Sequence, residues 1–135
     1  TVAGESIRTG SVEEVVFYDS VPLDFGPSRV ETGQIIGPDG QLEDRVFAVC
    51  FDSRKVFSFD PVHLRVESVI HTGRGPHDIA FDTGVDGDGE PFSLLFVGHF
   101  TDSYIGVVDL DMRRPLTFGQ MFASVGAPTP PKESK

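Results

Sequence analysis

Tryptophan is absent from the 135-residue sequence, and cysteine occurs once, as Cys50. A single cysteine excludes a disulfide within the chain and says little about the redox compartment. Cys50 stands in an apolar run, without a basic neighbour that would activate its thiol, so we expect it to be buried and unreactive. The aromatic residues are mainly phenylalanine, 12 against two tyrosines, and phenylalanine suits the half-buried surface of a β-sheet.

Positive charge is scarce, with 11 Lys and Arg against 21 Asp and Glu and a formal net charge of −10. A chain of this charge repels a phosphate backbone, so we expect no nucleic-acid partner. Long apolar runs are also missing. None approaches the roughly 20 residues that cross a bilayer, so we expect no transmembrane segment.

Helical patterning is missing as well, because no long window places apolar residues at helical spacing between a cap and a stop. Strand-sized runs take its place. Lys55–Asp60 shows alternation, and Leu94–Phe100 is continuously apolar, as in a strand covered on both faces. Val12–Asp19 and Arg29–Ile36 are two further expected strands, and Gly37–Gly40 has the composition of a tight turn. The sequence predicts an all-β fold.

Two hairpin-like segments repeat along the chain: RVFAVCFDSRKVFSFD (Arg45–Asp60) and FVGHFTDSYIGVVDLD (Phe96–Asp111). Aligned without gaps, they match at a constant spacing of 49 positions, as in Phe47 with Phe96 and Asp60 with Asp109. Each is followed by another strand-like run and then by glycine and proline. A period of about 50 residues made only of short strands is typical of a propeller blade or a related array. We expect the two repeated aspartates to cap turns.

The repeated segments resemble the YVTN-type β-propeller repeat. FVGHFTDSYIGVVD (Phe96–Asp109) follows its pattern of Tyr-Val-Thr-Asn, a polar turn and Val-Ser-Val-Ile-Asp, and FAVCFDSRKVFSFD (Phe47–Asp60) matches at the same length. The repeat then continues through a strand, Gly-x-x-Pro and a short apolar strand, here VESVIHTGRGPHDIAFD with one extra residue before Pro76. Phenylalanine replaces the usual tyrosine, and Cys50 and His99 replace the usual asparagine.

This resemblance implies four-stranded antiparallel blades with the innermost strand first. Residues 29–75 would form one full blade and 76–126 the next. Residues 1–28 would hold the outer strand of an earlier blade and a loop, and 127–135 a proline-rich tail. About two and a half blades do not close a ring, since propellers close with 4–8. We therefore expect a C-terminal portion of a larger propeller, or a subunit that completes one by association, with the remaining blades from a longer chain or another subunit.

An acidic stretch, DTGVDGDGE, places Asp82, Asp86, Asp88 and Glu90 among glycines. Hard cations such as Ca²⁺ take oxygen ligands from flexible acidic loops of this kind, so calcium is the one cofactor that the sequence suggests. The spacing differs from that of an EF-hand loop. The alternative is a solvated hairpin loop that binds nothing.

His71, His77 and His99 are the other candidates. By the resemblance, His77 opens an innermost strand near the central channel, and His99 lies near the end of the second strand, so both are channel-facing candidates. A metal site on the axis would need further histidines from other blades. The alternative is a structural histidine hydrogen-bonded to neighbouring backbone. Asp78 follows His77 directly, but adjacent strand residues point to opposite faces.

Two functions fit these observations. The first is a non-catalytic scaffold or binding surface within a larger propeller of a bacterial periplasmic, secreted or cell-surface protein. The second is part of a propeller enzyme or redox protein, such as a lactonase, a lyase or a dehydrogenase, with an axial histidine or metal site. A fold alone does not choose between them.

Overall fold

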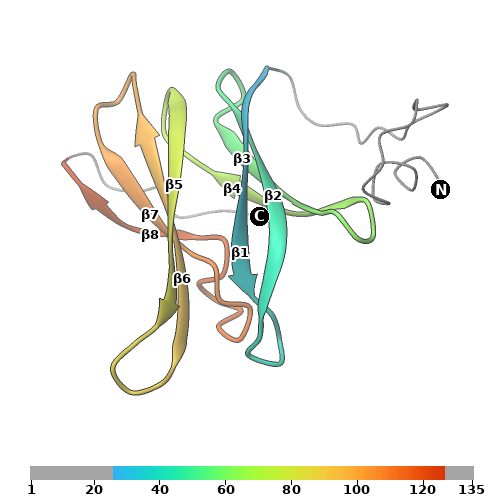
Figure 1. Ribbon diagram of the computed structural model, residues 1–135. Helices are drawn as coiled ribbons and strands as arrows, with labels where there is room; N and C mark the ends of the chain where they lie inside the picture. The colour runs from blue at the N-terminus through green and yellow to red at the C-terminus, as the bar shows by residue number, and fades with distance from the viewer. Residues whose placement is uncertain (1–25, 127–135) are drawn as a thin grey trace, which may run out of the picture.

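The computed structural model describes residues 26–126, which form eight β-strands and no helix (Figure 1). The strands make two four-stranded antiparallel sheets, each ordered as its strands follow in the chain. The first sheet consists of β1 (Pro27–Ile36), β2 (Leu42–Cys50), β3 (Lys55–Asp60) and β4 (Arg65–His71). The second consists of β5 (Pro76–Val85), β6 (Pro91–His99), β7 (Ile105–Asp109) and β8 (Met121–Val125).

The prediction of an all-β chain with blade-like four-stranded sheets that do not close a ring is confirmed. The expected strand Val12–Asp19 and the tail lie outside the described residues. β5 continues to Val85, so Asp82, the first residue of the acidic stretch, lies within the β5–β6 ladder opposite Leu94. The ladder extends because the turn that follows is as tight as its equivalent in the first sheet.

The two sheets repeat each other in register. Pro27 pairs with Cys50 and Ile36 with Leu42, and 49 positions later Pro76 pairs with His99 and Val85 with Pro91. Both first ladders carry an irregularity after the opening proline, and both third ladders carry one near the end of the third strand. The repeat seen in the sequence is therefore a repeat of backbone geometry.

The hairpin turns between the first two strands of each sheet are also equivalent. The Gly37 N–H bonds to the Gln41 carbonyl at 2.8 Å, and the Asp86 N–H bonds to the Glu90 carbonyl at 2.8 Å. Gly40 and Gly89 have φ values of 84° and 83°. Glycine adopts this left-handed conformation at little steric cost, which explains its position in both turns.

The fourth strand breaks the spacing. Val56 pairs with Ile70 in the first sheet, and Ile105 pairs with Val125 in the second, so β8 lies 55 positions after its equivalent β4. The six extra residues belong to the connection between β7 and β8. This connection joins the sheets: the Ile36 N–H bonds to the Leu110 carbonyl, and the Met112 N–H bonds to the Ile36 carbonyl, both at 2.9 Å.

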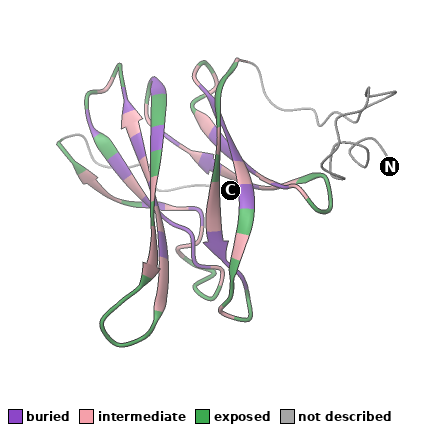
Figure 2. Cartoon of the chain, in the orientation of Figure 1, coloured by how far each residue is buried: buried purple, intermediate pink, exposed green. Residues whose placement is uncertain are grey.

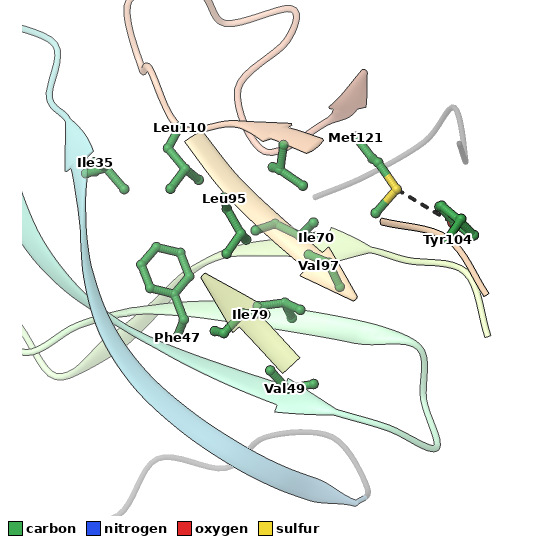
Figure 3. Close-up of a cluster of buried hydrophobic side chains, with 12 residues drawn as sticks. Ile35, Phe47, Val49, Ile70, Ile79, Leu95, Val97, Tyr104, Leu110 and Met121 are labelled. Carbon is green, nitrogen blue, oxygen red and sulfur yellow. Dashed lines mark hydrogen bonds between the residues drawn. The ribbon is translucent and has the colours of Figure 1, made fainter. Parts of the chain in front are cut away.

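The core lies between the sheets, where buried residues gather on facing strands while the hairpin turns are exposed (Figures 2 and 3). Phe47 is fully buried, and its ring lies 4.8 Å from that of Phe81 between centroids. Phe81 also packs on Gly33, where an added Cβ would meet its ring. Burying a side chain of this size stabilises a fold by about 1.5–3 kcal/mol.

Opposite faces of the repeat meet in this core. The first sheet contributes Phe47 and Val49 from β2, whereas the second contributes Leu95 and Val97 from β6. In the repeat alignment, Leu95 and Val97 are equivalent to Val46 and Ala48, which lie on the other face of β2 because successive strand residues alternate. The sheets therefore pack head to tail, with one kind of face against the other.

Candidate functional site

His99 is held by backbone groups on both sides of its ring. Its Nε2 accepts a hydrogen bond from the Gly73 N–H at 3.1 Å, so its Nδ1 carries the proton and donates to the Tyr104 carbonyl, also at 3.1 Å. The ring stacks on Tyr104 with centroids 4.0 Å apart. Burial lowers the pKa of His99, although the bond to the Tyr104 carbonyl partly opposes this shift. His99 is thus a neutral imidazole that anchors the connection between the sheets.

The same connection is fixed by Asp102 from the β6–β7 turn. Its carboxylate accepts bonds from the Arg74 N–H at 2.7 Å and from the Arg74 Nε at 2.8 Å. The pKa of Asp102 is lowered, chiefly by the bond from the Arg74 backbone. Residues 73–75 therefore lie against the turn of the second sheet, which positions β5.

His77 is exposed at the start of β5, and its ring lies 6.3 Å from that of Phe100. It lines a pocket of about 400 Å³ together with Gly98, Ile105 and Val125, and His99 also contributes to the pocket lining. The two candidate histidines are therefore near one another, but both ring nitrogens of His99 are already in use. The pocket surface is mainly apolar.

The acidic residues of the β5–β6 hairpin do not form one cluster. Asp82 lies in β5, and Asp86 caps the turn by accepting the N–H groups of Asp88 at 2.8 Å and Glu90 at 3.0 Å. Glu90 lies 3.6 Å from Arg113. Within residues 26–126, no group of three or more His, Cys, Asp or Glu side chains is placed to hold a metal ion.

Calcium binding by this hairpin stays a prediction. The expected affinity is that of weak extracellular sites, with a Kd of about 10⁻⁴–10⁻³ M. The test is thermal unfolding with and without 10 mM calcium, for the natural chain and for an Asp86→Asn/Asp88→Asn variant. An equal response in both proteins would count against the site.

Asp60 caps the turn after β3, as the sequence predicted. Its Oδ1 accepts the Val62 N–H at 2.9 Å, and its Oδ2 lies 2.7 Å from the His63 Nδ1. Burial by itself would raise the pKa of Asp60, but the bonds from His63 and Val62 together with the charge of Arg45 lower it to about 2.

Asp109 has the same role after β7, where it accepts the Asp111 N–H at 3.2 Å and the Thr117 hydroxyl at 2.6 Å. Arg114 adds two further bonds to this carboxylate, at 2.9 and 3.0 Å. In both sheets the aspartate that ends the third strand thus accepts the amide two residues further on, so the cap is part of the repeated turn.

The sequence interpretation missed a polar groove of about 640 Å³ beside this turn. Buried Arg45 forms its floor and binds Glu67 through two bonds, at 2.8 and 3.1 Å, and Glu43 at 2.9 Å. The bond to Glu67 raises the pKa of Arg45 above its ordinary value, against the opposing effect of burial. The alternation of Glu43 and Arg45 on β2 was the available signal, but Glu67 comes from β4 and only the folded sheet brings it there.

The polar side chains of this groove form a network that stabilises the sheet. Arg45 and the low-pKa Asp60 both stay charged at neutral pH, so neither is poised to exchange a proton with a substrate there. On the same sheet, the hydroxyl groups of Ser58 and Ser68 form a hydrogen bond of 2.7 Å with each other.

Comparison of the chain with protein-family models, with curated proteins and with solved structures found no match. In the part of the chain that the structure describes, no helix is long and apolar enough to cross a membrane.

Proposed function

We propose that the chain is a non-catalytic portion of a β-propeller of the YVTN type, and that it acts as a scaffold within a larger ring. The observation that carries the proposal is the repetition of one blade-like sheet, with the same register 49 positions apart, packed head to tail on its neighbour.

Head-to-tail packing favours a ring. A contact between two different faces leaves one face of each kind open at the ends, so it continues until the array closes or extends as a filament. Radial repetition of four-stranded sheets is how propellers close. The further sheets would come from a longer chain or from another subunit.

A scaffold fits the side chains better than an enzyme or redox centre does. Both nitrogens of His99 bind backbone groups, and Asp86 caps its own turn. These two side chains thereby stabilise connections between strands. A location in the periplasm, at the cell surface or outside a bacterial cell belongs to this proposal.

The native mass of the protein in its own cell tests the proposal. A tagged endogenous copy should purify in a species several times heavier than 14.7 kDa, with ring-shaped particles by electron microscopy. An endogenous species of 14.7 kDa, without further sheets, would overturn it.

A further inference from the structure

The second sheet has an outer face that points away from the first sheet. Cross-strand partners share a face, so the pairings of Phe96 with Val107, Gly98 with Ile105 and Ile105 with Val125 place these five residues together on it. Ile105 is 45% exposed and Val125 is 67% exposed. These five residues and Leu94 form the outer face.

The first sheet shows what this face does when it is covered. By register, Gly98, Ile105 and Val125 are equivalent to Val49, Val56 and Ile70. All three of those residues are 0% exposed, because the second sheet packs on them in the core. The outer face of the second sheet is thus a repeat of a surface that already binds a sheet.

Its chemistry is more apolar than that of the covered face. Arg45 and Glu67, which form the ion pair on the first sheet, correspond to Leu94 and Phe122 on the second, and Ser58 corresponds to Val107. Phe122 is 53% exposed. Burial of apolar side chains stabilises a fold more than burial of a polar pair does. The outer face of the second sheet is therefore better suited to lie against another sheet than to face water.

A hollow marks the place where a partner side chain would enter. Gly98 stands where the first sheet has Val49, and the pocket of about 400 Å³ lies over Gly98, Ile105 and Val125. An added Cβ at Gly98 would contact only the Asp78 carbonyl, at 3.6 Å, so the space above it is open.

We propose that the outer face docks a further four-stranded sheet of the same repeat, in the sense in which the second sheet lies on the first. A bulky apolar side chain of that sheet enters the pocket above Gly98. This inference rests on the proposed function and identifies the surface and the chemistry of its partner. The repetition of the observed interface selects a sheet of this repeat over an unrelated partner.

An extended chain tests the docking. Residues 1–130 are followed by a second copy of residues 76–126, which keeps the 55-position spacing from β4 to β8. The added sheet has an exposed outer face of its own, so binding of the dye ANS should stay close to that of the natural chain. Urea unfolding should remain one transition, with a slope about 1.5 times larger, because the slope scales with the surface exposed on unfolding.

Ile105→Asp is the matched variant in both chains. At residue 105 of the original second sheet in the extended chain, it should split unfolding into two transitions, because a charge would be buried between sheets. In the natural chain it should leave the urea midpoint nearly unchanged and lower dye binding at least twofold. The measurement on the natural chain does not depend on whether the extended chain folds.

Separate transitions in the extended chain, or dye binding that Ile105→Asp leaves unchanged in the natural chain, would overturn the inference. These results are independent of the native mass. A large endogenous ring that withstands Ile105→Asp would leave the proposed function in place and remove this surface from it. If the extended chain shows docking but the endogenous species is a 14.7 kDa monomer, the docking surface stands and the proposed function is overturned.

Discussion

Phe47 is the side chain at which the two sheets meet most closely. It is fully buried, packs on Phe81 and belongs to the core cluster. We expect Phe47→Ala to lower the free energy of unfolding by about 3–5 kcal/mol, because the cavity adds to the lost burial. Urea unfolding measures this change. Phe100→Ala is the control, since Phe100 is 77% exposed and should cost no more than about 0.5 kcal/mol. Similar losses from both variants would contradict the burial of Phe47 between the sheets.

Asp60 makes stability depend on pH in the acid range. Its folded pKa of about 2 lies below the unfolded value of 3.8, so its contribution is complete above pH 3.8 and is lost as pH falls toward 2. The contribution is on the order of 1–2 kcal/mol. Unfolding measured from pH 6 to pH 2 should show a shallower loss in Asp60→Asn than in the natural chain. Parallel curves would rule out this role.

His99 acts in a higher pH window. Burial lowers its folded pKa below 6.5, so the unfolded chain takes up the proton first, and stability falls as pH drops below 6.5. NMR titration of the ring should show a neutral imidazole with the proton on Nδ1 at pH 6.5. His99→Gln should remove the pH dependence in this window and lower stability at pH 8. A ring that is already protonated at pH 6.5 would contradict the bond from the Gly73 N–H.

At the scale of elements, the connection between β7 and β8 controls how the sheets unfold together. Leu110 is 1% exposed, and this connection makes two backbone bonds to Ile36. Replacing residues 110–119 with the shorter segment 61–64 should retain the strands but lose these contacts. We expect a loss of about 2–5 kcal/mol from the Leu110 side chain alone and separate unfolding of the sheets. Two unfolding transitions, followed by fluorescence and circular dichroism, would show that the sheets unfold separately. A single transition at the unchanged midpoint would count against this role of the connection.

The strands themselves were predictable because their signals are local. Alternation in Lys55–Asp60 and the glycine turns depend on near neighbours, and β3 has the predicted bounds. The acidic hairpin was harder. Its composition suggested convergence, but β5 continues past Asp82, and the backbone amides of the turn bind Asp86. A composition does not reveal whether a carboxylate already has donors nearby.

At the scale of the whole molecule, the outer face makes the isolated chain a poor monomer. Exposed Ile105, Phe122 and Val125 lie on one sheet, and apolar surface of this kind promotes association. Sedimentation at increasing concentration should show species heavier than 14.7 kDa, or the fluorescence of ANS should show that the chain binds the dye. A soluble 14.7 kDa monomer that binds no dye would contradict this expectation. Val62→Asp is the control, because Val62 is exposed on the β3–β4 turn, away from the outer face.

The repeat, the all-β class and the capping role of Asp60 and Asp109 follow from short stretches of sequence. They depend on strand alternation and on turn geometry, and a few adjacent residues settle both. The head-to-tail choice of faces, the pairing of Arg45 with Glu67 and the contact of Ile36 with Leu110 came only from the folded chain. These features join residues far apart in sequence, and which of them meet depends on how two whole sheets minimise their exposed apolar surface.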